Sequence, residues 1–199
     1  MTVKITYSKK YTDLSREMLI EKVSQQMSDK RFQHVLRVEE KACHLADLYQ
    51  VDREQASIAA LTHDYAKERP DNEMIDLIQS KSFDKTLLDY GNAIWHGILG
   101  AYLVQQELGI NDPVILEAIE THTTGAKVMS ELAKIIYVAD YVEEGRQFPV
   151  VKEARQLAEK NLDEAVAFET KHTLLHLINK EMKIYPKTIE TYNAWVVNP

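Results

Sequence analysis

Apolar residues recur every three or four positions through most of this chain, and strict alternation with a period of two is rare. A spacing of three to four places apolar side chains on one face of an α-helix. Residues that interrupt helices are also sparse, with 6 glycines and 5 prolines in 199 residues. The sequence therefore predicts an all-α fold, built as a single helical bundle.

Capping residues divide this pattern into separate helices. Thr12 or Asp13 is expected to cap the first helix, Asp52 the third, and Asp112 with Pro113 the sixth, while Pro186 is expected to end the long helix before it. The expected helices cover about residues 13–27, 30–49, 53–63, 70–79, 92–108, 113–121, 131–142, 150–160, 163–183 and 188–195.

Two of these helices carry ionisable groups where an apolar core is expected. Residues 57–67, SIAALTHDYAK, end an apolar run on His63 and Asp64, and the almost wholly apolar residues 131–142 contain Asp140. Burying a charge costs several kcal/mol unless the charge is paired or bound to a metal. Imidazole and carboxylate are ligands of iron, zinc and manganese, and a carboxylate can bridge two ions. We interpret residues 57–67 as the centre of a metal site, with further candidate ligands at His34, His96 and His122.

Composition and charge narrow the class of protein. The chain is long enough for one domain, it contains 45% hydrophobic and 28% charged residues, and no apolar run reaches the roughly 18 residues of a membrane span. Its net charge is −7, and no stripe of lysine and arginine is interleaved with aromatic residues. We therefore expect neither a nucleic-acid nor a membrane partner, and an anionic substrate would need local cations or a metal.

The N-terminus and the cysteine content predict a cytoplasmic protein. The first residues contain lysines but no apolar segment behind them, as a secretory signal would require. Cys43 is the only cysteine, so no disulfide can form within the chain, and its place in a helical pattern favours core packing.

The candidate ligands lie in segments that together resemble a known family. His34 in RFQHVLRV, His63-Asp64 in AALTHDYAK, His96 in NAIWHGILGAYLV, His122 in IETHTTG and Asp140 in IIYVADYVEEGRQF are similar to the ordered signature of the HD-domain metal-dependent phosphohydrolases. The flanking HDYAK, HTTG and ADYVEEGRQFP resemble its bacterial YqeK-like branch, symmetrical diadenosine tetraphosphate hydrolases that bind iron. The resemblance begins near residue 30, so we expect an N-terminal helix in residues 1–28 packed on an HD-type domain in residues 29–199.

This resemblance implies a dinuclear metal site, with iron as the first expectation and manganese or zinc as alternatives. One ion would be held by His34, His63, Asp64 and Asp140, and the other by Asp64, His96 and His122. The resemblance further implies hydrolysis of diadenosine tetraphosphate to two ADP by a metal-activated hydroxide, with Asp64 and Lys67 as catalytic residues.

Positive and polar groups near the signature are the expected substrate contacts. Lys67, Thr123 and Arg146 are candidates for holding the phosphate chain. The resemblance also implies that a C-terminal segment closes over the nucleoside, formed by Lys183, Ile184, Tyr185, Pro186, Lys187 and Thr188. Other histidines fare less well, because His172 and His176 lack a third ligand nearby and His44 lacks a matching motif, so we interpret them as packing or surface residues.

Other interpretations remain open from the sequence. The ligand set also suits an HD-type nucleotidase acting on a mononucleotide, or a module that senses a nucleotide without turnover. Arg31 and Arg37, which flank His34, either support the ligands or bind phosphate, or they are members of surface ion pairs. A homodimer is also left open.

Overall fold

The computed structural model describes residues 3–197, which form helices joined by short loops and contain no strand. The all-α prediction is confirmed. Its α-helices are α1 (Arg16–Ser24), α2 (Asp29–Tyr49), α3 (Arg53–Thr62), α4 (Asp71–Ser80), α5 (Asn92–Leu108), α6 (Pro113–Thr121), α7 (Glu131–Val142), α8 (Val151–Ala158), α9 (Leu162–Asn179) and α10 (Pro186–Tyr192). A 3-10 helix, η1 (Lys85–Asp89), and a π-helical turn, η2 (Asn193–Val197), complete the described part of the chain.

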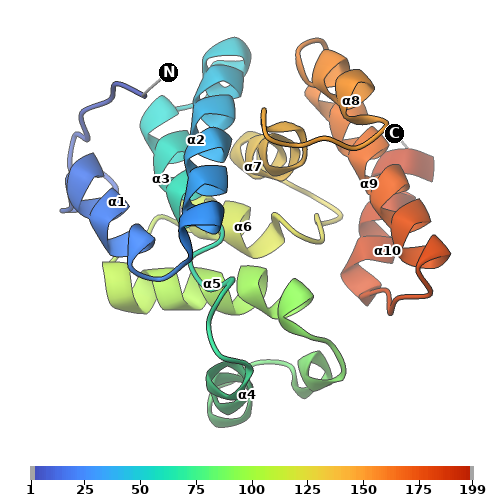
Figure 1. Cartoon of the computed structure of the whole chain (residues 1–199), viewed down its shortest axis with the longest axis horizontal. Coiled ribbons are helices and arrows are strands. Elements are labelled where there is room, and N and C mark those ends of the chain that lie inside the picture. The colour runs from blue at the N-terminus through green and yellow to red at the C-terminus, as the bar shows by residue number, and fades with distance from the viewer. Residues whose placement is uncertain (1–2, 198–199) are drawn as a thin grey trace.

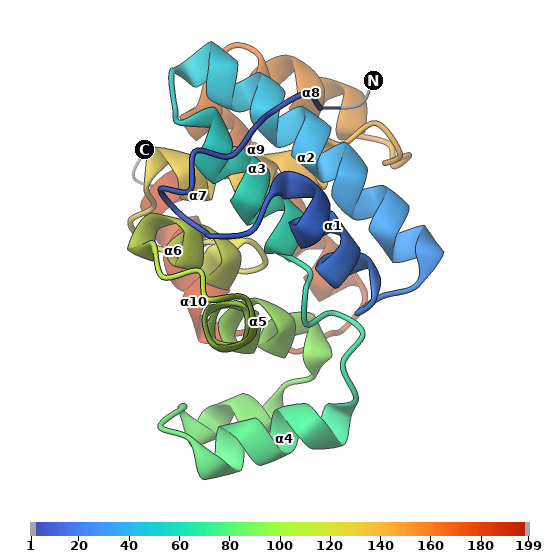
Figure 2. The ribbon, with the colours of Figure 1, turned by 90° about the vertical axis from the view of Figure 1, so that its left-hand side faces the viewer.

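Helix α7 lies at the centre of the arrangement and packs against α2, α3, α6, α8 and α9 (Figure 1). Every residue from Leu132 to Ala139 is buried, as its nearly uniform apolar character predicts. In the same view α8, α9 and α10 lie on one side of α7, and α2 and α3 lie on the other. Turned by 90°, the molecule shows α4 projecting below α5, away from the central helices (Figure 2).

Short polar side chains begin several helices by accepting bonds from free backbone N–H groups. Ser28 caps α2, Asp52 caps α3 and Asp112 caps α6, each by accepting from an N–H in the first turn. Gly109, with a φ of 68°, ends α5 in the left-handed conformation that glycine adopts without strain. In the described chain, no helix has the length and apolar character needed to cross a membrane.

Three boundaries differ from the sequence prediction. The first helix begins after Ser15, whose side chain accepts a bond from the Met18 N–H, rather than after Thr12 or Asp13. The long helix α9 ends at Asn179, because Glu181 adopts a φ of 52° well before the proline. Pro186 therefore does not end α9 but occupies the first turn of α10, where its missing N–H leaves no helical bond unmade.

A buried ion pair fastens the N-terminal helix to the rest of the molecule. The Arg16 guanidinium donates to both oxygens of Glu39 over 2.7 and 2.6 Å, and Ser57 donates to Glu39 Oε1 over 2.6 Å. Tyr7 shares a hydrogen bond with Ser57 over 2.8 Å. Helices α1, α2 and α3 and the segment before α1 thus meet at the carboxylate of Glu39.

Replacing Arg16 by methionine tests this attachment. We expect Arg16→Met to lower the free energy of unfolding by about 3–5 kcal/mol, because it leaves the Glu39 carboxylate buried without its cation. Urea denaturation followed by circular dichroism measures the change. The control is Arg53→Met, since Arg53 pairs with Asp47 where both side chains are exposed, and a loss of about 1 kcal/mol or less is expected there. Equal losses of unfolding free energy in the two variants would contradict a special contribution of the buried pair to stability.

Candidate metal centre and substrate cavity

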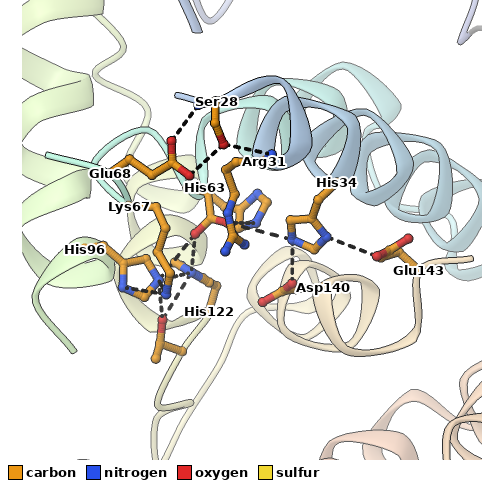
Figure 3. A network of polar contacts seen from close by, with 12 residues as sticks. Ser28, Arg31, His34, His63, Lys67, Glu68, His96, His122, Asp140 and Glu143 are labelled. Atoms are coloured by element: carbon orange, nitrogen blue, oxygen red, sulfur yellow. Dashed lines mark hydrogen bonds and ion pairs between the residues drawn. The ribbon is translucent and has the colours of Figure 1, made fainter. Parts of the chain in front are cut away.

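The six predicted metal ligands converge at one point from five elements (Figure 3). His34 projects from α2, His63 and Asp64 follow α3, His96 lies in α5, His122 follows α6, and Asp140 lies in α7. All are buried except Asp140, whose side chain is 23% exposed. Three overlapping groups have ligand atoms within 4.8 Å of one another, and they are His34 with His63 and Asp64, His63 with His122 and Asp140, and Asp64 with His96 and His122.

Asp64 occupies the middle of this cluster and directs its two oxygens to different sides. Its Oδ2 lies 3.4 Å from His63 Nε2 and 3.8 Å from His34 Nε2. Its Oδ1 lies 3.4 Å from His96 Nε2 and 3.7 Å from His122 Nε2. One carboxylate is therefore shared between two pairs of imidazoles, as a bridge between two cations requires.

The histidines are oriented by bonds on their outer nitrogens. Nδ1 of His63, His96 and His122 lies 2.6–2.7 Å from the backbone oxygens of Ala60, Asn92 and Ile119 respectively. A carbonyl can only accept, so each Nδ1 carries a proton, and in the neutral ring each Nε2 then presents a lone pair. The inner nitrogens of His34 and His63 are buried; His63 Nε2 makes no hydrogen bond in the described chain, and His34 Nε2 lies 3.0 Å from Asp140 Oδ1. Inward lone pairs beside carboxylates are the donor set of a transition-metal site, so the residues fit a metal.

Local electrostatics keep the two carboxylates ionised. Burial alone would raise the pKa of Asp64, but His63 and the other imidazoles hold that pKa well below its usual range. For Asp140 the opposing groups are His34 and Arg146, and its pKa is likewise held well below the ordinary value. Burial, with His122 and Lys67 adding to it, lowers the pKa of His96 to about 3. The centre thus offers anionic oxygens and a neutral imidazole at His96, whereas at His63, against the effect of burial, the Asp64 carboxylate raises the pKa of the ring.

Three cationic side chains approach the same cluster. Arg31 donates to Asp64 Oδ2 over 2.9 Å, and Arg146 donates to Asp140 Oδ1 over 2.5 Å. Lys67 Nζ lies 3.3 Å from His96 Nε2, and burial lowers the pKa of this ammonium. Lys67 and Arg146 were predicted near the site, whereas for Arg31 the sequence left open a supporting group, a phosphate-binding group or a member of a surface ion pair.

A cavity of about 750 Å³ opens beside these residues. Its size falls within the range of roughly 300–1,000 Å³ that small-molecule sites occupy. The metal ligands and cations on its wall are Arg31, Asp64, Lys67, His96, His122, Asp140 and Arg146. Thr123 also lines it, with Oγ1 3.1 Å from Nε2 of both His96 and His122. The predicted phosphate contacts Lys67, Thr123 and Arg146 therefore all line this cavity.

The C-terminal segment lies outside the lining of this cavity. Lys183 donates to the Asp89 carbonyl over 2.8 Å, and Lys187 pairs with Glu120 over 3.1 Å. The ring of Tyr185 meets that of Tyr90 edge-on, with centroids 5.0 Å apart, and Thr188 is buried. Ile184 is half-buried, and Pro186 to Thr188 form the first turn of α10 rather than a loop.

Several residues with a place in the site were missed or interpreted differently from the sequence. Glu143 accepts from Arg37 over 2.6 Å and lies 3.1 Å from His34 Nδ1, yet nothing in the sequence separates it from Glu144. His172 and His176 line the cavity, whereas the sequence suggested packing or surface roles. Glu169 also lines the cavity. Its place within the apolar stripe of α9 is a feature of the sequence that indicates a buried ionisable group. His44 is exposed and pairs with Glu159, as a surface role predicts.

Comparison with known proteins identifies the family of this chain. The model of the HD domain family matches residues 31–145, which include all six candidate ligands. The chain belongs to the HD domain family.

Similarity to curated proteins and to a solved structure narrows the class further. A protein of Bacillus subtilis named "Bis(5'-nucleosyl)-tetraphosphatase, symmetrical" is 43% identical over 93% of this chain and 99% of its own length. A Staphylococcus aureus protein of the same name is 37% identical over 86% of this chain and 89% of its own length. A crystal structure from Clostridium acetobutylicum, described as a predicted HD superfamily hydrolase involved in NAD metabolism, has a TM-score of 0.85 and 34% identity over 94% of this chain and 99% of its own. Within the family, the chain groups with these YqeK-like hydrolases.

The contact between Glu143 and His34 generates a test of the metal centre. We expect Glu143→Gln to weaken metal binding by about 10- to 100-fold, because an anion on the outer nitrogen raises the basicity of the inner one. Calorimetric titration of the metal-free protein with Fe²⁺ or Mn²⁺ gives the affinity. The matched control is Glu144→Gln, since the neighbouring side chain is 67% exposed and pairs only with Lys41 among the contacts seen. Equal affinities for the two variants would contradict the assignment.

Proposed function

We propose that this protein is a symmetrical bis(5'-nucleosyl)-tetraphosphatase that hydrolyses diadenosine tetraphosphate to two molecules of ADP. The observation that carries the proposal is the sharing of Asp64 between two pairs of inward-facing imidazoles beside a cavity with three cationic side chains. The names of the similar proteins from Bacillus subtilis and Staphylococcus aureus support the choice of substrate.

The proposed centre holds two metal ions, with iron as the first choice and manganese or zinc as alternatives. His34, His63, Asp64 and Asp140 would hold one ion, and Asp64, His96 and His122 the other. The chemistry that two bound cations supply is a lowered pKa for water and a field that neutralises phosphate oxygens. No serine or cysteine nucleophile is then required, and Cys43 is buried in the core with burial raising the pKa of its thiol to about 12.

The protein side chains have the tasks of holding and registering the phosphate chain. Lys67 and Arg31 present positive charge at the Asp64 side of the cavity, and Arg146 presents it at the Asp140 side. Symmetrical cleavage breaks the bond between the second and third phosphates, so that each product keeps two phosphates. Cations on both sides of the ligand cluster suit a substrate whose charge extends equally in both directions from that bond. We assign Thr123 a hydrogen bond to the same chain.

The C-terminal residues Lys183, Ile184, Tyr185, Pro186, Lys187 and Thr188 are proposed to contact one nucleoside. Their support is the way α10 is tied to the turn after His122. Thr191 donates to the Thr124 carbonyl over 2.9 Å, and Gly125 lies so close that a Cβ on it would come within 2.4 Å of Thr191 Cγ2. We further propose that residues 1–28 act as an attachment to the HD-type domain and that the protein works in the cytoplasm.

A panel of nucleotides tests the proposed reaction. Incubation of metal-loaded protein with diadenosine tetraphosphate should give ADP alone, identified by chromatography, and Asp64→Asn should abolish turnover and lower metal content because a neutral amide bridges two cations poorly. AMP and ATP as products would show asymmetrical cleavage. Release of phosphate from a mononucleotide instead would favour the nucleotidase. Tight binding without any product would favour a nucleotide sensor. Asp64→Asn with full metal content and wild-type turnover would refute the bridging role.

The role of Lys67 can be separated from metal binding. We expect Lys67→Met to keep metal content while kcat/KM falls by a factor corresponding to about 2–4 kcal/mol, the cost of removing a preorganised charge from the transition state. Lys67 makes a cleaner variant than Arg146, since Arg146 forms a 2.5 Å ion pair with the candidate ligand Asp140, whereas the contact of Lys67 with His96 is 3.3 Å long and joins a cation to an imidazole. Lys152→Met on α8, an exposed lysine, serves as the control. An unchanged kcat/KM in Lys67→Met would show that this lysine does not stabilise the transition state.

A further inference from the structure

The cavity has a second wall that the metal centre does not use. One side of it comes from α9, through Glu169, His172 and His176, and the other from the end of α7, through Tyr141, and from the loop after it, through Phe148. The rings of Tyr141 and Phe148 lie with their centroids 4.7 Å apart. Flat aromatic surfaces with a few polar groups are the usual lining of a site for a planar organic group.

Glu169 is the unexplained residue of this wall. Its side chain lines the cavity, the residue is 6% exposed, and Oε2 is buried without a hydrogen-bond partner in the described chain. Burial raises the pKa of Glu169 well above its usual value, with Asp140 adding to the shift and Arg146 opposing it. An unsatisfied buried polar group costs about 1–3 kcal/mol, so the protein alone gives no reason for a carboxyl here.

A neutral carboxyl group has a definite complement. It places an O–H donor beside a C=O acceptor. Adenine presents the matching pair on its edge, with the N6 amino group as donor beside a ring nitrogen as acceptor, and the amide of glutamine reads that edge in the same way. Glu169 therefore has the chemistry to pair with adenine through two hydrogen bonds.

A dinucleoside substrate has two nucleosides, and the proposed C-terminal contact accounts for one. We propose that Glu169 binds the adenine of the other nucleoside, with α9 and the aromatic pair of Tyr141 and Phe148 forming its subsite. This inference rests on the proposed function. It makes the wall formed by α9 the feature that separates a dinucleoside substrate from a nucleotide with a single base.

The inference is tested with two substrates that differ by one nucleoside: diadenosine tetraphosphate and adenosine 5'-tetraphosphate. We expect Glu169→Met to lower kcat/KM for the dinucleoside by about 10- to 100-fold. The value of kcat/KM for the mononucleoside should change by less than about threefold, because only the dinucleoside fills the subsite. Glu169→Gln should stay within about threefold of the wild type on both, since the amide keeps a donor beside an acceptor. Glu153→Met, at an exposed glutamate of α8, is the control and should leave both values unchanged.

Stability separates recognition from a structural role. Glu169→Met should keep or raise the melting temperature, because it removes a buried carboxyl that has no partner. An unchanged ratio between the two substrates, or an equal loss on both with a lower melting temperature, would overturn the inference. Glu169→Gln behaving like Glu169→Met would also overturn it, since the contact would then need an ionised carboxylate.

Failure of the proposed function gives a different result. The proposed function is refuted if the wild-type protein cleaves neither compound. In that case, calorimetric titration of the same two compounds into the metal-loaded wild-type protein and into Glu169→Met tests the subsite by binding alone. Tighter binding of the dinucleoside that Glu169→Met loses supports the subsite, and equal binding in both proteins excludes it.

Discussion

The buried carboxylate of Asp64 is the constraint on which the rest of the structure depends. It is 2% exposed and ionised, and the bonds on the outer nitrogens of His63, His96 and His122 turn the inner nitrogens of these rings toward it. His96 Nε2 and His122 Nε2 are also only 3.0 Å apart. Arg31 supplies one positive charge, but a cluster of inward lone pairs and anions is favourable only with cations among them. Metal binding should therefore contribute directly to folding stability.

Helix ends give the site its precision. His63 and His122 are the C-cap residues of α3 and α6, and each directs Nδ1 to the carbonyl three residues earlier, which would otherwise lack a partner. The same bond satisfies the helix terminus and fixes the ring, so backbone structure alone aims the inner nitrogen. His96 achieves this within α5 through the Asn92 carbonyl. Only His34 depends on a side chain, Glu143, for its orientation.

What the sequence could predict follows from this difference between local and distant contacts. The helices and the clustering of the candidate ligands could be predicted, because caps such as Asp52 and Asp112 and the motifs around His63 and His122 are local in the chain. Glu143 was not readable, because its role depends on α2 and α7 packing side by side, 109 residues apart at the contact with His34. The position of Pro186 was misjudged since a proline can end one helix or begin the next, and the turn at Glu181 decided between them.

The candidate metal ligands and the second cavity wall come from different parts of the chain. All six candidate ligands lie within residues 31–145, which the HD domain family shares, whereas the second cavity wall comes largely from α9 beyond them. Arg155 joins the two parts, since it leaves α8 to donate to the carbonyls of Val142, Glu143 and Arg146. This arrangement fixes the residues after α7, including Arg146, against the C-terminal helices. Under the proposed function, changes in α9 would alter which nucleoside fits the cavity without moving a candidate metal ligand, so substrate choice would vary on a constant centre.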